Sequence, residues 1–231
     1  MTEDAPVLVL IPGYMLNEKL WGKFEAHLPP RYQICHASIE GGRTIQEIAR
    51  HMITYLPERF TLIGFSLGGY LARQLAADFP ERVASLVLVA SSLREDTVQQ
   101  AETKRRSTAS MQPTTFKGLS HTAIAKSLHP DNATNLELIA FIQQMGRELG
   151  YDRFVTQSLM PRKDVPAATL NCSTLVIASA EDALRSPEEV KELSEAIPGA
   201  SFKILSGSGH MLPLEQPQKL ATEIIDWLIK N

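Results

Sequence analysis

Short apolar runs alternate with longer stretches of helical periodicity along most of the chain. Residues 7–11 are continuously apolar, which is typical of a strand that is buried on both faces of a sheet. Between such runs apolar residues recur at helical spacing, and Thr44 with Glu47 forms a capping box at the start of one helix. The pattern predicts strands at 7–11, 33–37, 60–65, 86–90, 174–178 and 202–205, and helices at about 18–28, 45–53, 70–77, 187–196 and 218–229.

Strands joined by helical crossovers, without hairpin signals, predict an α/β fold with a mostly parallel sheet of about six strands and helices on both faces. The alternation stops between residues 93 and 165, where no β-branched run has the length of a strand. A segment of roughly 70 residues is too long for a structureless loop. Helices are expected there near 95–109, 121–129, 134–149 and 151–159. We therefore expect one core domain, 1–92 with 166–231, interrupted by an inserted helical lid at 93–165.

Composition places the chain among ordinary globular proteins. Its 231 residues are 44% apolar and 21% charged, with a net charge of −3, so nucleic-acid binding is not expected. No apolar run is long enough to span a membrane, and the first residues lack the features of a signal peptide. Two cysteines, Cys35 and Cys172, are too few for a disulfide framework and are expected to be buried thiols. These features indicate a cytoplasmic protein that does not bind membranes.

The expected lid is more basic than the rest of the chain. Residues 93–165 carry ten Lys and Arg residues against eight Asp and Glu residues, which gives this segment +2 and leaves −5 elsewhere. Such an excess can mark an anionic partner. Exposed helix faces are commonly charged, however, and solvated faces are the simpler interpretation.

The third apolar run leads directly into Gly-Phe-Ser-Leu-Gly at residues 64–68, and a helix-forming stretch follows at once. A strand, a sharp turn and a helix in this order place a serine at the apex of the turn, with its hydroxyl above the sheet. The turn strains the backbone of Ser66, and the flanking Gly64 and Gly68 leave room for it. Ser66 is therefore the candidate nucleophile, and the alternative is a glycine-rich turn with an incidental serine.

A serine hydroxyl becomes a good nucleophile when a base takes its proton and an acid holds that base in the correct tautomer. Asp182 follows the fifth predicted strand and His210 follows the sixth, at the sheet edge where open parallel sheets bind ligands. The order Ser66, Asp182, His210 along the chain is typical of a nucleophile-elbow fold. We predict these three as catalytic, with Glu181 as the competing acid. The other five histidines are expected on the surface or in the core.

An oxyanion hole needs two backbone N–H groups directed at the developing negative charge. One is expected from Leu67, which follows the nucleophile, and the other from Tyr14, in the tight bend after the first strand. Pockets in such enzymes are mostly apolar, so apolar lid and loop residues are candidates for substrate contact, although core packing explains each of them equally. These candidates are Met15, Met111, Phe141, Met145 and Met211.

The motifs at the first strand, the candidate nucleophile and the candidate base resemble those of the α/β-hydrolase superfamily over nearly the whole chain. Within it, residues 8–17 and 64–69 are similar to the pimeloyl-carrier methyl esterases of biotin synthesis. One departure is Pro12, where the superfamily usually has histidine. The resemblance implies a serine carboxylesterase with the triad and oxyanion donors assigned above, no cofactor and no metal. Its substrates would be short- to medium-chain acyl esters, carried by an acidic acyl-carrier protein if the lid cations are functional.

Two other functions are compatible with the same residues. A lyase or carbon–carbon bond hydrolase would use the triad for proton abstraction, and trapping of an acyl-enzyme at Ser66 argues against it. A ligand receptor of the same fold would retain the triad without turnover. Stabilisation of the protein by a ligand that it does not turn over favours this second alternative.

Overall fold

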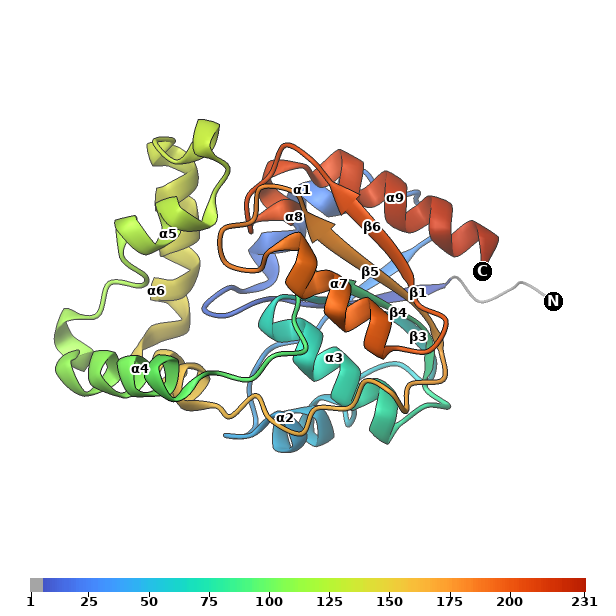
Figure 1. The fold of residues 1–231 in the computed structure, drawn as a ribbon, viewed down its shortest axis with the longest axis horizontal. Helices are drawn as coiled ribbons and strands as arrows, with labels where there is room; N and C mark the ends of the chain where they lie inside the picture. The colour runs from blue at the N-terminus through green and yellow to red at the C-terminus, as the bar shows by residue number, and fades with distance from the viewer. Residues whose placement is uncertain (1–5) are drawn as a thin grey trace.

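A computed structural model describes residues 6–231, and six parallel strands form one sheet at its centre (Figure 1). The sheet order is β2-β1-β3-β4-β5-β6, and every neighbouring pair is parallel. The predicted α/β fold with a parallel six-stranded sheet is therefore confirmed. The strands are β1 (Val7–Ile11), β2 (Gln33–His36), β3 (Phe60–Phe65), β4 (Val83–Val89), β5 (Ser173–Ser179) and β6 (Ser201–Leu205).

The strand order reverses at β1, which lies between β2 and β3. The chain moves to one side of β1 to form β2 and then crosses to the other side to form β3. At such a reversal the neighbouring loops leave the sheet in opposite directions and open a crevice at the carboxyl ends of the strands. The loop after β1 and the turn after β3 flank this crevice. The topology therefore predicts a ligand-binding site between the loop that contains Tyr14 and the turn that contains Ser66.

Helices cover both faces of the sheet, and alternate residues of β1 show how the core is divided. Val9 and Ile11 belong to a cluster with α2, α3 and α7, whereas Leu8 and Leu10 belong to a cluster with α1, α8 and α9. Successive side chains of a strand point to opposite faces, so a strand buried on both sides is apolar throughout. These helices are η1 (Glu18–Trp21), α1 (Gly22–Glu25), α2 (Ile45–Met52), α3 (Leu67–Asp78), α7 (Pro187–Ala196), α8 (Leu212–Glu215) and α9 (Pro217–Lys230).

Several boundaries differ from those expected. The helix expected at 18–28 is a 3-10 turn followed by one turn of α-helix that ends at Glu25. Strand β4 begins at Val83, three residues earlier than predicted. The prediction started at Leu86 because Ser85 interrupts the apolar run, but Ser85 pairs with both neighbouring strands. Helix α8 has four residues, which is too short to leave a periodic signal.

Between β4 and β5 the chain forms only helices, which lie beside the sheet rather than over either face (Figure 1). We call the predicted segment that contains them, residues 93–165, the helical insertion. Gly150, with φ of 81°, interrupts its longest helix, so the two helices expected on either side of this residue follow one another across a kink. None of the described helices has the combination of length and apolar character that crossing a bilayer requires. The insertion contains α4 (Val98–Ser110), η2 (Pro113–Thr115), α5 (His121–Ser127), η3 (Pro130–Asn132) and α6 (Leu136–Leu159).

A buried arginine joins the two ends of the helical insertion to α3. Arg73 is fully buried, and its guanidinium donates to the carbonyl oxygen of Ser92 at 3.1 Å. It also donates to the carbonyl oxygens of Val165 at 3.2 Å and Pro166 at 3.0 Å. Burial lowers the pKa of Arg73 to about 10, and the group lies over the ring of Tyr70. One side chain therefore holds the points at which the chain enters and leaves the insertion.

Candidate active site

Ser66 lies between β3 and α3 in a backbone conformation that residues other than glycine rarely adopt, with φ of 52° and ψ of −112°. The turn brings its flanking backbone segments into close contact. A Cβ atom at Gly64 would collide with the carbonyl group of Gly68, and one at Gly68 would collide with the carbonyl oxygens of Ile11 and Pro12. Glycine at both positions therefore allows the loop after β1 to pack directly against the first turn of α3.

Strand β4 and the residues after it hold this turn in place. The backbone N–H of Ser66 donates to the carbonyl oxygen of Val89 at 2.9 Å. The hydroxyl of Ser91 donates to the carbonyl oxygen of Ser66, also at 2.9 Å. Ser91 was not among the predicted site residues, although its position directly after a buried strand is a signal that could have identified it. The strained turn is thus stabilised by hydrogen bonds on both of its backbone polar groups.

The three predicted catalytic side chains form one hydrogen-bonded chain. Nε2 of His210 lies 2.9 Å from Oγ of Ser66, and Nδ1 lies 2.7 Å from Oδ2 of Asp182. The other carboxylate oxygen, Oδ1, accepts hydrogen bonds from the backbone N–H groups of Leu184 at 2.7 Å and Arg185 at 2.9 Å. An ionised carboxylate only accepts, so the proton of the neutral imidazole lies on Nδ1. This leaves Nε2 free to accept the serine proton.

Glu181, the competing acid, points to a different part of the site. Its carboxylate accepts hydrogen bonds from the backbone N–H groups of Gly207 at 2.9 Å and Ser208 at 3.3 Å. Both groups lie in the loop that carries His210. Glu181 therefore holds this loop, and it is Asp182 that contacts the imidazole.

Glu215, which the sequence analysis did not identify, links the same loop to the helical insertion. Its Oε2 accepts from the backbone N–H of Gly209 at 2.9 Å, and its Oε1 accepts from the backbone N–H of His129 at 2.7 Å. The backbone N–H of His210 in turn donates to the carbonyl oxygen of Ser127 at 2.7 Å. The backbone of the candidate base is thus held by the insertion as well as by the core.

The two predicted oxyanion donors lie at the crevice, and neither donates a backbone hydrogen bond within residues 6–231. Leu67 begins α3, where the first N–H groups of a helix are unpaired and carry partial positive charge. Helix α6 holds the loop that contains Tyr14. The phenol oxygen of Tyr14 lies 2.7 Å from the hydroxyl oxygen of Ser158, and the backbone N–H of Met15 donates to the side-chain oxygen of Gln157 at 2.8 Å. Ser158 and Gln157 are buried polar residues that sequence reasoning missed.

A cavity of about 600 Å³ lies between the core and the helical insertion, and Ser66 and His210 are part of its wall. This volume lies within the usual range for a site that binds a small molecule. Its apolar wall comes from both the core and the insertion. It includes Tyr14, Phe65, Met111, Phe116, Phe154 and Met211.

Met111 and Met211 are the two predicted pocket residues that the structure brings to the cavity wall. The expectation is corrected for the other three, which do not line this cavity. Met15 and Met145 are fully buried, and Phe141 is 39% exposed. Helical periodicity separates a buried face from an exposed one, but it does not distinguish packing in the core from contact with a cavity.

No group of three or more His, Cys, Asp or Glu side chains within residues 6–231 is arranged to hold a metal ion. Cys35 and Cys172, which were expected to be buried, are half-buried free thiols. Burial raises the pKa of both thiols. Neither cysteine belongs to the wall of the cavity that contains Ser66.

The sequence model of the alpha/beta hydrolase family matches residues 8–223. The chain is also similar to the pimeloyl-[acyl-carrier protein] methyl ester esterase of Pectobacterium carotovorum, with 37% identity over 93 residues. The corresponding enzyme of Aeromonas hydrophila is 34% identical over 99 residues. These two alignments cover 37% and 38% of this chain and 36% and 39% of the relatives. The matched part thus spans little more than a third of the length of these relatives.

Among solved structures, the chain resembles a thermophilic esterase from Thermogutta terrifontis with a TM-score of 0.83 and 24% identity. That alignment covers 97% of this chain and 90% of the esterase. The enol-lactonase from Burkholderia xenovorans also gives a TM-score of 0.83, with 17% identity and coverage of 97% and 92%. At these identities the likeness shows a shared fold.

Proposed function

The chain belongs to the alpha/beta hydrolase family, and from this premise we propose that it is a serine carboxylic-ester hydrolase. The observation that carries the proposal is the chain of hydrogen bonds from Ser66 through His210 to Asp182, at 2.9 and 2.7 Å. A nucleophile, a base and an acid in this geometry, at the wall of a cavity, are the requirements for acyl transfer. Ester hydrolysis is also the activity that the names of the curated relatives state.

In the first half of the reaction, Oγ of Ser66 attacks the ester carbonyl while Nε2 of His210 takes its proton. The new C–O bond pushes the carbonyl electron pair onto oxygen, where the N–H groups of Leu67 and Tyr14 stabilise the negative charge. Asp182 stabilises the imidazolium that forms. The tetrahedral intermediate then collapses: the bond to the alcohol breaks, His210 gives its proton to the departing oxygen, and an acyl group remains on Ser66.

The second half repeats these steps with water. His210 removes a proton from the water as its oxygen attacks the acyl carbon, and a second tetrahedral intermediate forms. When this intermediate collapses, the bond to Oγ breaks and His210 returns the proton to Ser66. The carboxylic acid product leaves the cavity. A wall built from the core and the helical insertion limits the acyl chain, so short and medium chains are the proposed substrates.

A fluorophosphonate probe and a panel of esters test this function. We expect the probe to label Ser66 once per chain, and p-nitrophenyl esters from acetate to octanoate to be hydrolysed faster than long-chain esters. Heat-denatured protein serves as the control, because labelling requires the assembled triad. Labelling without turnover of any ester contradicts the assignment. Stabilisation by an ester that is not hydrolysed supports a ligand receptor instead.

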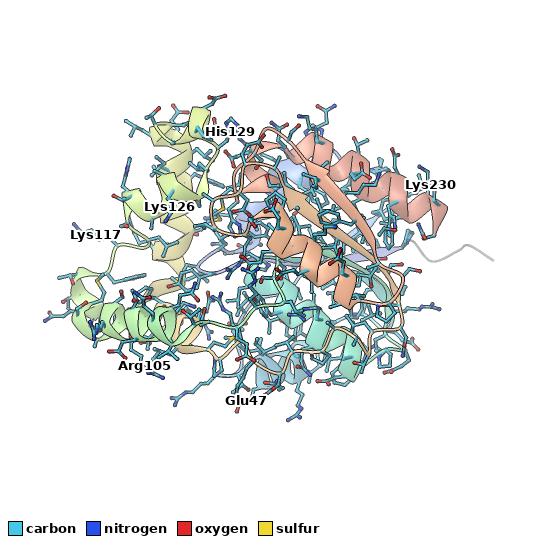
Figure 2. All side chains as sticks on the ribbon, viewed as in Figure 1. Glu47, Arg105, Lys117, Lys126, His129 and Lys230 are labelled. Atoms are coloured by element: carbon cyan, nitrogen blue, oxygen red, sulfur yellow. The ribbon has the colours of Figure 1, made fainter. Side chains whose placement is uncertain are left out.

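An ester attached to an acyl-carrier protein is a second candidate substrate, and exposed cations on the helical insertion favour it. Lys117, Lys126 and Arg147 are exposed and form no ion pair within the described part of the chain. Lys117, Lys126 and Arg105 all lie on the insertion (Figure 2). Lys126 also belongs to the wall of the cavity that contains Ser66. An acidic carrier would thus meet positive charge beside the cavity.

Salt dependence distinguishes a carrier-linked ester from a free one. Raising the ionic strength from 0.1 to 1 M shortens the Debye length from about 10 to about 3 Å, which screens attraction between exposed charges. If the carrier is the partner, we expect kcat/KM for carrier-linked ester to fall by roughly tenfold or more. A neutral free ester with the same acyl group should change by less than about twofold. Equal salt dependence of the two substrates would remove the carrier and leave a hydrolase of free esters.

A further inference from the structure

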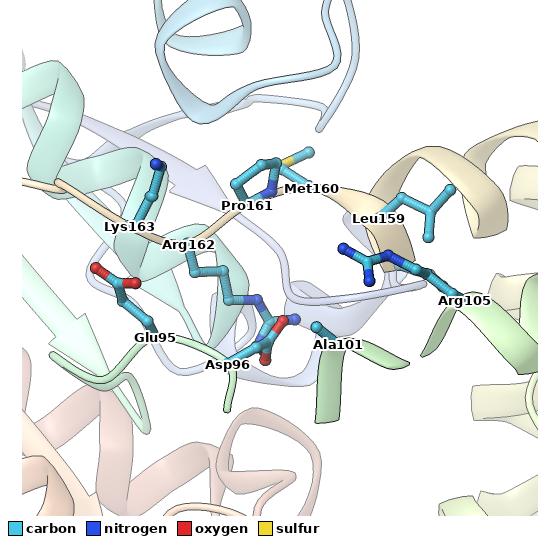
Figure 3. Close-up of a pocket in the computed structure, with 10 residues that line it drawn as sticks. Glu95, Asp96, Ala101, Arg105, Leu159, Met160, Pro161, Arg162 and Lys163 are labelled. Carbon is cyan, nitrogen blue, oxygen red and sulfur yellow. The ribbon is translucent and has the colours of Figure 1, made fainter. Parts of the chain in front are cut away.

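Arg162 lies near the end of the helical insertion, where two cavities meet. It belongs to the wall of the 600 Å³ cavity that contains Ser66 and to the wall of a second cavity of about 180 Å³. Asp96 and Ser158 also belong to both walls. Figure 3 shows the side chain of Arg162 extending from the segment after α6 toward Asp96. A positively charged group thus adjoins the space in which the proposed reaction occurs.

The guanidinium of Arg162 lacks the hydrogen-bond acceptors that its burial requires. Its side chain is only 9% exposed, and its Nε is buried with no hydrogen-bond partner among residues 6–231. Within residues 6–231 the one carboxylate near it is Asp96, whose Oδ1 lies 3.9 Å from Nη1, which is beyond hydrogen-bonding distance. The ring of Tyr70 lies on one side of it, with a distance of 5.7 Å from Cζ to the ring centroid. A guanidinium whose Nε is buried without an acceptor within residues 6–231, and whose carboxylate neighbour there is 3.9 Å away, indicates a ligand that supplies acceptors.

The surrounding charges also favour an anion. Lys104 forms an ion pair of 2.5 Å with Asp96 and belongs to the wall of the larger cavity. One carboxylate is therefore shared between two cations. Burial lowers the pKa of Lys104, and the positive charges of Arg162 and Arg185 lower it further, while Asp96 acts in the opposite direction. Arg162, Lys104 and Asp96 form a cationic cluster, which carries two positive charges and one negative charge.

Tyr14 connects this cluster to the proposed reaction centre. Its backbone N–H is the proposed oxyanion donor, and its phenol reaches Ser158, which also borders the second cavity. Burial raises the pKa of the phenol, and the nearby charge of Arg162 acts against that increase. Tyr14, Ser66 and Arg162 all belong to the wall of the larger cavity. An acyl chain bound at Ser66 therefore lies in the same cavity as Arg162 and Lys104.

We propose that Arg162 and Lys104 form a carboxylate-binding subsite, and that the preferred substrate is a half-ester of a short dicarboxylic acid. The ester lies at Ser66, and the free carboxylate at the other end of the acyl chain binds Arg162. A guanidinium holds a carboxylate through two parallel N–H···O bonds, which provides the acceptors that Arg162 lacks. This inference rests on the proposed ester hydrolysis and names its substrate class. It favours a free acid over a carrier-linked ester, since a carrier would occupy the same end of the acyl chain.

A charged and a neutral ester of the same acid test the subsite. We expect wild-type kcat/KM to be higher for monomethyl adipate than for dimethyl adipate. In Arg162→Gln the ratio of the two values should fall by on the order of tenfold to a hundredfold, because hydrogen bonds between charged groups are the strong ones. Arg162→Lys should restore part of the ratio, since it keeps the charge but not the paired geometry. Arg50→Gln, at an exposed position on α2, is the matched control and should leave the ratio unchanged.

A binding measurement separates this inference from the proposed function. In Ser66→Ala, calorimetry should show monomethyl adipate binding that weakens at least tenfold when Arg162→Gln is added. Such binding without hydrolysis of either ester by the wild type would refute the esterase and retain the subsite. Hydrolysis of dimethyl adipate with an unchanged ratio in Arg162→Gln would refute the subsite and retain the esterase. If Arg162→Gln does not fold, as judged by its melting curve, the same ratio measured in Lys104→Gln decides, and an unchanged ratio again refutes the subsite.

Discussion

Replacing Ser66 with alanine should lower kcat/KM for ester hydrolysis on the order of 10⁴-fold or more, because the nucleophile is removed. The fold should persist. The strained turn is held by Gly64, by Gly68 and by the hydrogen bond from Ser91, none of which involves the Ser66 hydroxyl. Steady-state assays with the best ester of the panel and a thermal melting curve measure the two parts of this expectation.

Ser206→Ala is the matched control, since the same hydroxyl is removed from an exposed position in the loop before His210. It should retain wild-type turnover. Retention of more than a tenth of the activity by Ser66→Ala, with an unchanged melting temperature, would show that another group attacks the ester. The proposed mechanism would then be wrong at its first step.

The second large effect is expected from Asp182→Asn, which should lower kcat/KM by roughly 10³- to 10⁴-fold. An amide nitrogen facing Nδ1 of His210 would donate a hydrogen bond, so the imidazole would carry its proton on Nε2. In that tautomer Nε2 cannot accept the proton of Ser66. The asparagine oxygen can still accept from the backbone N–H groups of Leu184 and Arg185, so the loop itself should be preserved. Turnover and urea unfolding of the same preparation give the measurement.

Glu181→Gln makes the same chemical change one residue earlier. Its oxygen can continue to accept from the N–H groups of Gly207 and Ser208, and its side chain is not in contact with the imidazole. We expect a loss of less than about fivefold, since an uncharged acceptor weakens these bonds without removing them. A larger loss in Glu181→Gln than in Asp182→Asn would contradict the assignment of the acid.

The sheet and the three central side chains could be predicted because their signals are local. A strand buried on both faces is apolar throughout, and parallel strands bring their carboxyl ends to one edge. It follows that Asp182 and His210, each placed after a strand, lie near the serine of the turn after β3. Glycines at 64 and 68 were predictable for the same reason, since the turn leaves no space for a side chain. Each inference needed only the residues within a few positions of the site.

The residues that hold the site in place could not be predicted in this way. Gln157 and Ser158 contact the loop after β1 across more than 140 positions of sequence. Their contacts depend on how α6 packs against the core, and no periodicity in either segment specifies that packing. Glu215 lies on a helix too short to predict. In the sequence, Arg162 is one of several cations of the insertion. Its burial, and the lack of an acceptor for its Nε among residues 6–231, distinguish it from the exposed cations in the structure.

Arg73 fixes the two points at which the helical insertion joins the core. Because one guanidinium binds carbonyl groups at both ends of the helical insertion, the 93–165 segment leaves and re-enters the core at a single point. Because the two ends of this segment lie together, its length does not change the distance between β4 and β5. Away from the residues that hold the loops of the site (Ser127, His129, Gln157 and Ser158), the insertion can therefore change in sequence and length to suit a new acyl group, while β3, β5 and β6 continue to present the same three side chains.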